Sequence, residues 1–232
     1  MLLGVAFAVV FAFLMAFADA PAIIWARGLP REVVTAFRAI TDFGKAAWFL
    51  YPLPALMILL LLVPRDLPRA AQATFTALFA RVAFLFFAIG IPYWFNAVLK
   101  QVIGRARPFV GGAPDPYLFR PFSWGPEYAS LASNHTVTVC AVAIAFGALW
   151  PRLRPILWLY AIIIAVSRVI VIAHHPSDVL AGAVVGACGA LLVRHYFAAR
   201  RLVFGVTPNG KVEPFAAPSR QRVWAALLSV FA

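Results

Sequence analysis

Charged and titratable side chains border the apolar stretches of this 232-residue sequence in three groups. Arg168 lies inside one such stretch, where a charge is energetically costly and usually functional. In chain order the groups are Lys100 with Arg107, then Ser133-Asn134-His135, then Arg168 with His174 and Asp178. Together they hold three cations, two histidines and one carboxylate, a set that suits the binding of a phosphoryl group.

These residue types can share the work of moving a phosphoryl group. The three cations can neutralise its equatorial oxygens, where negative charge spreads during transfer. His174 and Asp178 are four residues apart, so on a helix the carboxylate can hold one imidazole nitrogen while the other attacks phosphorus. His135 can protonate the leaving oxygen and then activate water. Ser133 and Asn134 stand at the predicted start of a helix, where free N–H groups bind anions.

The same residues predict no metal and no cofactor. A two-metal mechanism needs several carboxylates, and these three groups offer only Asp178. Cys140 and Cys188 each lie inside an apolar run, without the spacing of a zinc site or a disulfide framework. Arg105 and His175 have no spacing that recommends them, and we assign neither a catalytic role.

The composition excludes a soluble domain. Hydrophobic residues make up 64% of the chain, charged residues only 12%, and the mean hydropathy is +0.90. A soluble domain carries about 25% charged residues to solvate its surface. The 20 basic and 8 acidic residues give a net charge of +12, but no run of Lys and Arg with interleaved aromatics appears. We therefore predict an integral membrane protein that contacts membrane lipids and binds no nucleic acid.

Six apolar segments predict an all-α bundle of six transmembrane helices. The first, residues 2–18, can extend towards Trp25, and Ala18-Asp19-Ala20 at its end also resembles a signal-peptidase site. The absence of a basic segment before it favours a retained helix over a cleaved signal peptide. The other predicted spans are residues 46–63, 82–99, 133–150, 156–173 and 179–197.

Basic residues are distributed unevenly between the predicted loops. The loops assigned to the inner side carry ten basic and two acidic residues, and those assigned to the outer side carry nine basic and six acidic. Short loops rich in Lys and Arg face the cytoplasm. We therefore expect both termini in the cytoplasm, and all three groups of candidate residues at the periplasmic face of a bacterial inner membrane.

The remaining segments suggest one membrane domain and a tail. The extracytoplasmic connection between the third and fourth helices, residues 101–132, has five prolines and no apolar run, which is typical of a functional or disordered loop. We expect a membrane domain at residues 1–206, with its motifs at residues 100–178. Residues 207–232 form a cytoplasmic tail, of which 223–232 can be a short interfacial helix. Gly182 and Gly186 predict close helix packing.

The order and spacing of the candidate residues also resemble the sequence signature of a known family. The three parts are Lys100-x6-Arg107-Pro108, Ser133-x-His135 and Ser167-Arg168-x5-His174-x3-Asp178. They resemble the signature of the type 2 phosphatidic acid phosphatases, whose superfamily includes membrane lipid phosphate phosphatases, glucose-6-phosphatases and soluble vanadium haloperoxidases. The resemblance covers about residues 82–197, and the six-helix layout extends it to the rest of the chain.

The resemblance assigns a role to each matching position. It implies that His174 forms a phosphohistidine, that Asp178 orients this histidine and that His135 is the acid and base. Phosphate binding falls to Lys100, Arg107, Ser133, Asn134 and Arg168. The family usually has Pro-Ser-Gly-His where this chain has Ala132-Ser133-Asn134-His135. Glycine there allows a positive φ, which Asn tolerates best among the other residues, so we expect Asn134 to preserve the turn. The expected result is a mildly slowed enzyme with an unchanged substrate preference, and the alternative is that Asn134 alters the substrate.

Together these observations predict a metal-independent phosphatase that hydrolyses a lipid phosphate or diphosphate at the periplasmic face through a phosphohistidine. Candidate substrates by resemblance are undecaprenyl diphosphate, phosphatidic acid, phosphatidylglycerol phosphate and lipid A. One alternative is a phosphotransferase that uses the same residues to pass phosphate to another lipid. The other is an inactive lipid-phosphate-binding or transport component, which is disfavoured because no catalytic position is lost. The six apolar spans exclude a soluble haloperoxidase, and oligomeric state does not follow from the sequence.

Overall fold

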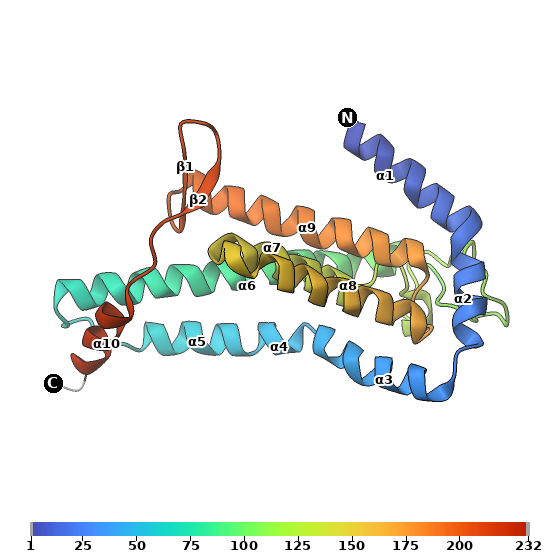
Figure 1. Ribbon diagram of the computed structural model, residues 1–232, viewed down its shortest axis with the longest axis horizontal. Coiled ribbons are helices and arrows are strands. Elements are labelled where there is room, and N and C mark those ends of the chain that lie inside the picture. The colour runs from blue at the N-terminus through green and yellow to red at the C-terminus, as the bar shows by residue number, and fades with distance from the viewer. Residues whose placement is uncertain (1, 231–232) are drawn as a thin grey trace.

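Most of the long apolar segments form helices along the long axis of the molecule, as the computed structural model of residues 2–230 shows, whereas the first, Leu2–Arg27, runs across one end (Figure 1). Within these residues five helical segments are long and apolar enough to cross a membrane: Leu2–Arg27, Arg31–Leu61, Arg69–Ile103, Pro151–Ile170 and Pro176–Ala199. The fourth predicted span, residues 133–150, forms α7 (Asn134–Leu149), whose 16 residues are apolar but fewer than a full crossing requires. A mostly helical membrane fold is confirmed, with one two-stranded hairpin near the end of the described residues, and the count of six spans stays a prediction.

The two N-terminal segments are each divided into shorter helices. The sequence prediction began the second span at residue 46 and omitted the helix α3 (Arg31–Thr41), because Arg31, Glu32 and Arg38 interrupt the apolar pattern. The pieces are α1 (Leu2–Phe13), a π-helical turn (Leu14–Ala18), α2 (Asp19–Arg27), α3 (Arg31–Thr41), a 3-10 turn (Asp42–Gly44), α4 (Ala47–Leu50) and α5 (Pro52–Leu61).

Four further helices carry or border most of the candidate residues. α6 (Arg69–Ile103) begins well before the predicted start at residue 82, because its first turns are rich in alanine, a strong helix former, rather than in large apolar residues. α7 follows a long loop and ends at Leu149, and a 3-10 turn (Pro151–Leu153) leads into α8 (Arg154–Ile170). α9 (Pro176–Ala199) completes the group, and Figure 1 shows these helices side by side along the long axis.

The apolar core joins α6, α7 and α9 in the half of the molecule away from the long loop. Phe84 of α6 meets the rings of Phe197 and Phe204 edge-on, at centroid distances of 5.5 and 4.7 Å. Phe84 and Phe204 are fully buried, and small residues of α7 fill the space around them. This packing fixes how the helices stand relative to one another.

Gly182 and Gly186 bring α9 close to α7. A Cβ on Gly186 would lie 2.2 Å from the carbonyl oxygen of Val137, and one on Gly182 would lie 2.7 Å from that of Ser133. Neither position has room for a side chain. The prediction of close packing at this pair is confirmed, and the packing sets the start of α9 against the start of α7.

The loop after α6 is ordered by its own hydrogen bonds. Gly104 ends α6 with a φ of +64°, and a Cβ there would collide with the Arg120 carbonyl group, so this turn requires glycine. Arg120 N–H donates to the Gly104 oxygen (2.7 Å), and Ser130 N–H donates to the Arg105 oxygen (3.0 Å). The loop therefore lies across the end of the bundle near α2 and returns to α7 (Figure 1).

The C-terminal segment folds back on the opposite end of the bundle. β1 (Phe204–Val206) pairs antiparallel with β2 (Val212–Pro214), and a short helix, α10 (Arg220–Leu228), follows. Ala226 of α10 packs against Ala71 and Phe75 of α6. The predicted domain boundary after residue 206 falls within this hairpin, and the last two residues of the predicted tail lie outside the described residues.

Candidate active site

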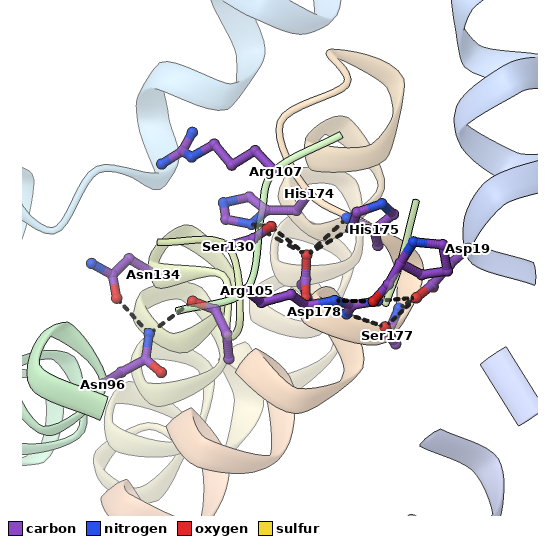
Figure 2. Close-up of polar contacts among 12 residues, drawn as sticks. Asp19, Asn96, Arg105, Arg107, Ser130, Asn134, His174, His175, Ser177 and Asp178 are labelled. Carbon is purple, nitrogen blue, oxygen red and sulfur yellow. Dashed lines mark hydrogen bonds and ion pairs between the residues drawn. The ribbon is translucent and has the colours of Figure 1, made fainter. Parts of the chain in front are cut away.

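The carboxylate of Asp178 is the centre of a buried polar cluster at the start of α9. Its Oδ1 accepts a hydrogen bond from Arg105 Nη1 (2.6 Å). Its Oδ2 accepts from Ser130 Oγ (2.6 Å) and from the backbone N–H of His175 (2.9 Å), which caps the helix (Figure 2). Asp178 is fully buried, so these partners fix its orientation and compensate for its lost hydration.

His174 lies in the turn before α9, and its contact with Asp178 differs from the prediction. Its Nδ1 is 3.8 Å from Asp178 Oδ2, which is too far for a hydrogen bond, and 3.5 Å from Ser130 Oγ. The expected geometry assumed that both residues lie on one helix, but α9 begins only at Pro176. Ser130 therefore occupies the position between the two groups, donating to Asp178 while its oxygen faces His174.

Burial keeps the imidazole of His174 neutral. Desolvation lowers the pKa of His174 from its ordinary value of 6.5 to about 4, and Asp178 offsets only part of this effect. The Nδ1 side of the ring faces Ser130 and Asp178, so a proton on Nδ1 leaves the lone pair on Nε2. A neutral imidazole with a free Nε2 is the form that a nucleophile requires.

Three cations from three different elements lie near one another, and two of them, Arg107 and Arg168, also lie near His174. Lys100 lies near the end of α6, Arg107 in the long loop and Arg168 near the end of α8, and they are close enough for their charges to interact. Arg107 Nε donates to the Pro126 oxygen (2.9 Å), and burial lowers the pKa of Arg107 while Asp178 opposes this. The structure thus brings together the predicted phosphate-binding cations, and Figure 2 shows Arg107 beside His174.

Arg168 is held in place by the last residue of α3. Its Nη1 donates to Thr41 Oγ1 (2.7 Å), while its buried Nε has no hydrogen-bond partner within the described part of the chain. The guanidinium is only 8% exposed, so an unpaired donor there is unfavourable unless a ligand or water meets it. An anion bound between these cations would satisfy that donor.

The start of α7 adds the remaining predicted residues. Ser133 precedes the first turn of α7, and its buried hydroxyl has no hydrogen-bond partner among residues 2–230. His135 follows in that turn, within range of the charges of Arg168 and His174. Since the first N–H groups of a helix have no partner within it, this end offers both a hydroxyl and backbone donors to an anion.

The expectation of a left-handed turn at Asn134 was wrong. Asn134 is the first residue of α7, and the non-glycine residues with positive φ in the described chain are Phe109, Phe122, Ile172 and Arg201. Its Oδ1 accepts a hydrogen bond from Asn96 Nδ2 (2.6 Å), which also donates to the Ala132 oxygen (2.9 Å). The amide therefore ties α7 to α6.

Sequence reasoning missed four members of the cluster: Asp19, Arg105, Ser130 and Ser177. Arg105 has the largest fully buried side chain of the described residues, although its spacing in the sequence gave no signal. Asp19 did carry a signal, because it is an acidic residue within the apolar first helix. Ser130 and Ser177 have no distinctive position in the sequence, and only their contacts identify them.

Comparison with known families and proteins agrees with this geometry. A family model described as the PAP2 superfamily matches residues 81–202. A lipid A 1-phosphatase of Rhizobium johnstonii is 36% identical over 197 residues, which are 83% of this chain and 78% of that protein. A lipid A 1-phosphatase of Rhizobium etli is 34% identical over 83% of this chain and 82% of that protein.

Two solved structures share the fold. The crystal structure of LpxE from Aquifex aeolicus has a TM-score of 0.54 and 21% identity, and covers 77% of this chain and 95% of that one. That of a transmembrane PAP2-type phosphatidylglycerolphosphate phosphatase from Bacillus subtilis has a TM-score of 0.53 and 18% identity, covering 83% and 94%. At these identities the likeness concerns the arrangement of the helices.

Proposed function

The chain belongs to the PAP2 superfamily, and on this premise we propose that it is a membrane lipid phosphate phosphatase that removes the 1-phosphate of lipid A. One observation supports the phosphatase activity: the charges of Arg107 and Arg168 reach a neutral, buried His174 at one end of the apolar helices, and Lys100 lies within range of both arginines and of Asp178. The names of the two Rhizobium relatives favour lipid A over the other candidate lipids.

The proposed reaction proceeds in two steps. His174 Nε2 attacks phosphorus and the bond to the lipid oxygen breaks, while His135 gives its proton to that oxygen. His135 then takes a proton from water, which attacks the phosphohistidine, and the phosphorus–nitrogen bond breaks to release inorganic phosphate. The three cations and the start of α7 stabilise the charge that develops on the phosphoryl oxygens.

We expect turnover without a metal ion. Within the described residues no group of three or more His, Cys, Asp and Glu side chains is arranged to hold a metal. The two buried carboxylates near the site, Asp19 and Asp178, already accept hydrogen bonds from Arg105. EDTA should therefore leave phosphate release unchanged, whereas strong inhibition that a divalent metal reverses would contradict this part of the proposal.

A panel of substrates tests the function. Purified protein in detergent should release inorganic phosphate from lipid A, and not from lipid A that carries only the 4′-phosphate. Phosphatidic acid, phosphatidylglycerol phosphate and undecaprenyl diphosphate are tested separately as alternative substrates. Phosphate release only from one of these would refute the lipid A assignment, and none from any of them would refute the phosphatase. Radiolabel that moves from lipid A to a second lipid would identify a phosphotransferase.

Trapping the intermediate tests the role of His174. Rapidly quenched wild-type protein should carry radiolabel from lipid A on His174, and His174→Ala should carry none while it still folds in detergent. Label on a different residue of the wild type would overturn the proposed nucleophile.

The proposed orientation places the site at the periplasmic face of the inner membrane and both termini in the cytoplasm. Residues 111–115 lie in the long loop and Arg152 in the turn between α7 and α8. In a Cys188→Ser background, which removes the exposed native thiol, a cysteine at Gly112 should react with an impermeant maleimide in intact spheroplasts. An Arg152→Cys variant should react only after permeabilisation, and the reverse pattern would invert the orientation.

A further inference from the structure

A buried chain of charged groups connects α2, in the N-terminal segment, to the candidate active site. Arg105 Nη2 contacts Asp19 Oδ2 of α2 (2.7 Å), and Arg105 Nη1 contacts Asp178 Oδ1 of α9 (2.6 Å). All three side chains are fully buried. We call these residues the Asp19–Arg105–Asp178 network, and Figure 2 shows them side by side.

We propose that Arg105 is a positioning residue for phosphoryl transfer, and that Asp19 acts through it from the N-terminal helix. The proposal rests on the proposed function, in which Asp178 and Ser130 hold the Nδ1 side of His174. Arg105 takes Oδ1 of Asp178, which leaves Oδ2 for Ser130 and the histidine side of the cluster. The guanidinium thereby decides which carboxylate oxygen faces His174.

Arg105 is itself held at every nitrogen. Nε donates to the Pro116 oxygen in the long loop (3.0 Å), and Nη1 also donates to Ser177 Oγ (2.7 Å). Asp19 in turn accepts hydrogen bonds from Ser177, through Oγ (2.5 Å) and the backbone N–H (2.9 Å). Because a guanidinium has a fixed planar fork, anchoring it at Asp19, Pro116 and Ser177 also determines where it meets Asp178.

The network affects the protonation of the His174 imidazole as well as its orientation, because its charges lie close to the ring. Two carboxylates and one guanidinium leave one net negative charge behind His174. The positive and titratable groups around His174 are Arg107 of the loop, Arg168 of α8, His135 of α7 and His175 beside it, with Lys100 of α6 next to Arg107 and Arg168. In a buried site, removal of the Asp19 charge should make protonation of His174 less favourable.

Three variants test the network with lipid A as the probe. Arg105→Gln should lower kcat by about 100-fold with little change in KM, because a misplaced catalytic group slows the chemical step. Asp19→Asn, which keeps the shape and one acceptor, should lower kcat less and move the acid limb of the pH–rate profile to lower pH. In the double variant the Asp19 substitution should have no additional effect on kcat, since Asp19 positions the reacting groups only by holding Arg105.

Controls separate positioning from folding. Arg81→Gln removes a half-buried arginine at the opposite end of α6, whose Nη2 donates to the Phe215 and Ala216 oxygens (both 2.9 Å), and should leave kcat and the acid limb unchanged. Arg105→Lys keeps the charge and should restore part of the kcat that Arg105→Gln loses. If Arg105→Gln does not fold, the Asp19→Asn pH profile decides.

The outcomes distinguish this inference from the proposed function. A wild type without phosphatase activity would refute the function itself. A wild type whose activity depends on His174, with Asp19→Asn showing an unchanged acid limb and unchanged kcat, would refute the inference alone. Equal, additive losses from Asp19→Asn and Arg105→Gln would also refute it, because independent structural defects add.

Discussion

The two ends of the helical bundle bury opposite kinds of side chain. At the end with the long loop the buried groups include four charged or titratable side chains, Arg105, Asp178, His174 and Asp19. At the other end the fully buried groups are apolar: Phe84, Phe197 and Phe204 pack with alanine and valine residues, and the half-buried Arg194 lies over the ring of Phe204. The same helices, α6, α7 and α9, run through both.

This difference shows how the chain divides stability and chemistry between its ends. The aromatic end excludes water and gains stability from burial, which is roughly proportional to area and tolerates some change of shape. The polar end must keep each buried charge paired, because an unpaired buried charge is strongly destabilising, and this pairing fixes the positions of the predicted catalytic groups. Substitutions at the two ends should therefore have different signatures.

The largest effect should come from His174→Ala at the polar end. Loss of the nucleophile should lower the rate of phosphate release by at least about 10⁴-fold, since no other group can form the covalent intermediate. Thermal unfolding in detergent should change little, because the ring makes no hydrogen bond shorter than 3.5 Å. Residual activity within tenfold of the wild type would show that the chemistry does not reside at this histidine.

Phe204→Ala at the aromatic end should show the opposite signature. Truncating this fully buried ring should lower the free energy of unfolding by about 3–5 kcal/mol. The kcat per folded molecule should stay near that of the wild type, because the site lies at the other end of α9. Denaturant melts and activity of the folded fraction measure the two quantities, and a large loss of kcat would mean that the ends are coupled.

Acidification should affect the polar end first. The pKa of His174 is lowered to about 4, so the neutral nucleophile persists above that pH and the rate should fall about tenfold for each pH unit below it. The unfolded chain, with a histidine pKa of 6.5, binds protons more readily. The contribution of His174 to stability is thus complete above pH 6.5 and is lost as the pH falls towards 4.

Unfolding of His174→Ala should show a weaker dependence on pH over that interval, which isolates the contribution of this histidine. An acid limb of the wild-type pH–rate profile above pH 6, in contrast, would mean that another group controls the reaction.

The smallest effect should come from Asn134→Gly at the start of α7. It removes the hydrogen bond from Asn96 to the Asn134 oxygen and should lower the free energy of unfolding by about 1 kcal/mol. Relative rates on the panel of lipid phosphates should remain the same as in the wild type, because the amide contacts α6. Loss of activity on one lipid alone would make Asn134 a specificity residue instead.

Much of the site could be predicted because its residues lie at fixed spacings. Lys100, Arg107 and Arg168 were identified as charges next to apolar segments, and the structure brings them together. Their catalytic and binding roles stay predictions. α3 escaped prediction because hydropathy detects lipid-facing runs and not amphipathic helices.

The sequence by itself indicated a membrane protein, the three groups of polar candidate residues and phosphoryl chemistry, because the lengths of apolar segments and the spacing of residues are properties of the chain alone. Only the tertiary structure decided that Asp19 and Arg105, 86 residues apart, share a buried ion pair, and that Ser130 lies between His174 and Asp178. It also decided that Asn134 binds Asn96 and starts a helix. These contacts arise when the loop after α6 folds across the bundle, and no local pattern records where a loop meets a helix distant in sequence.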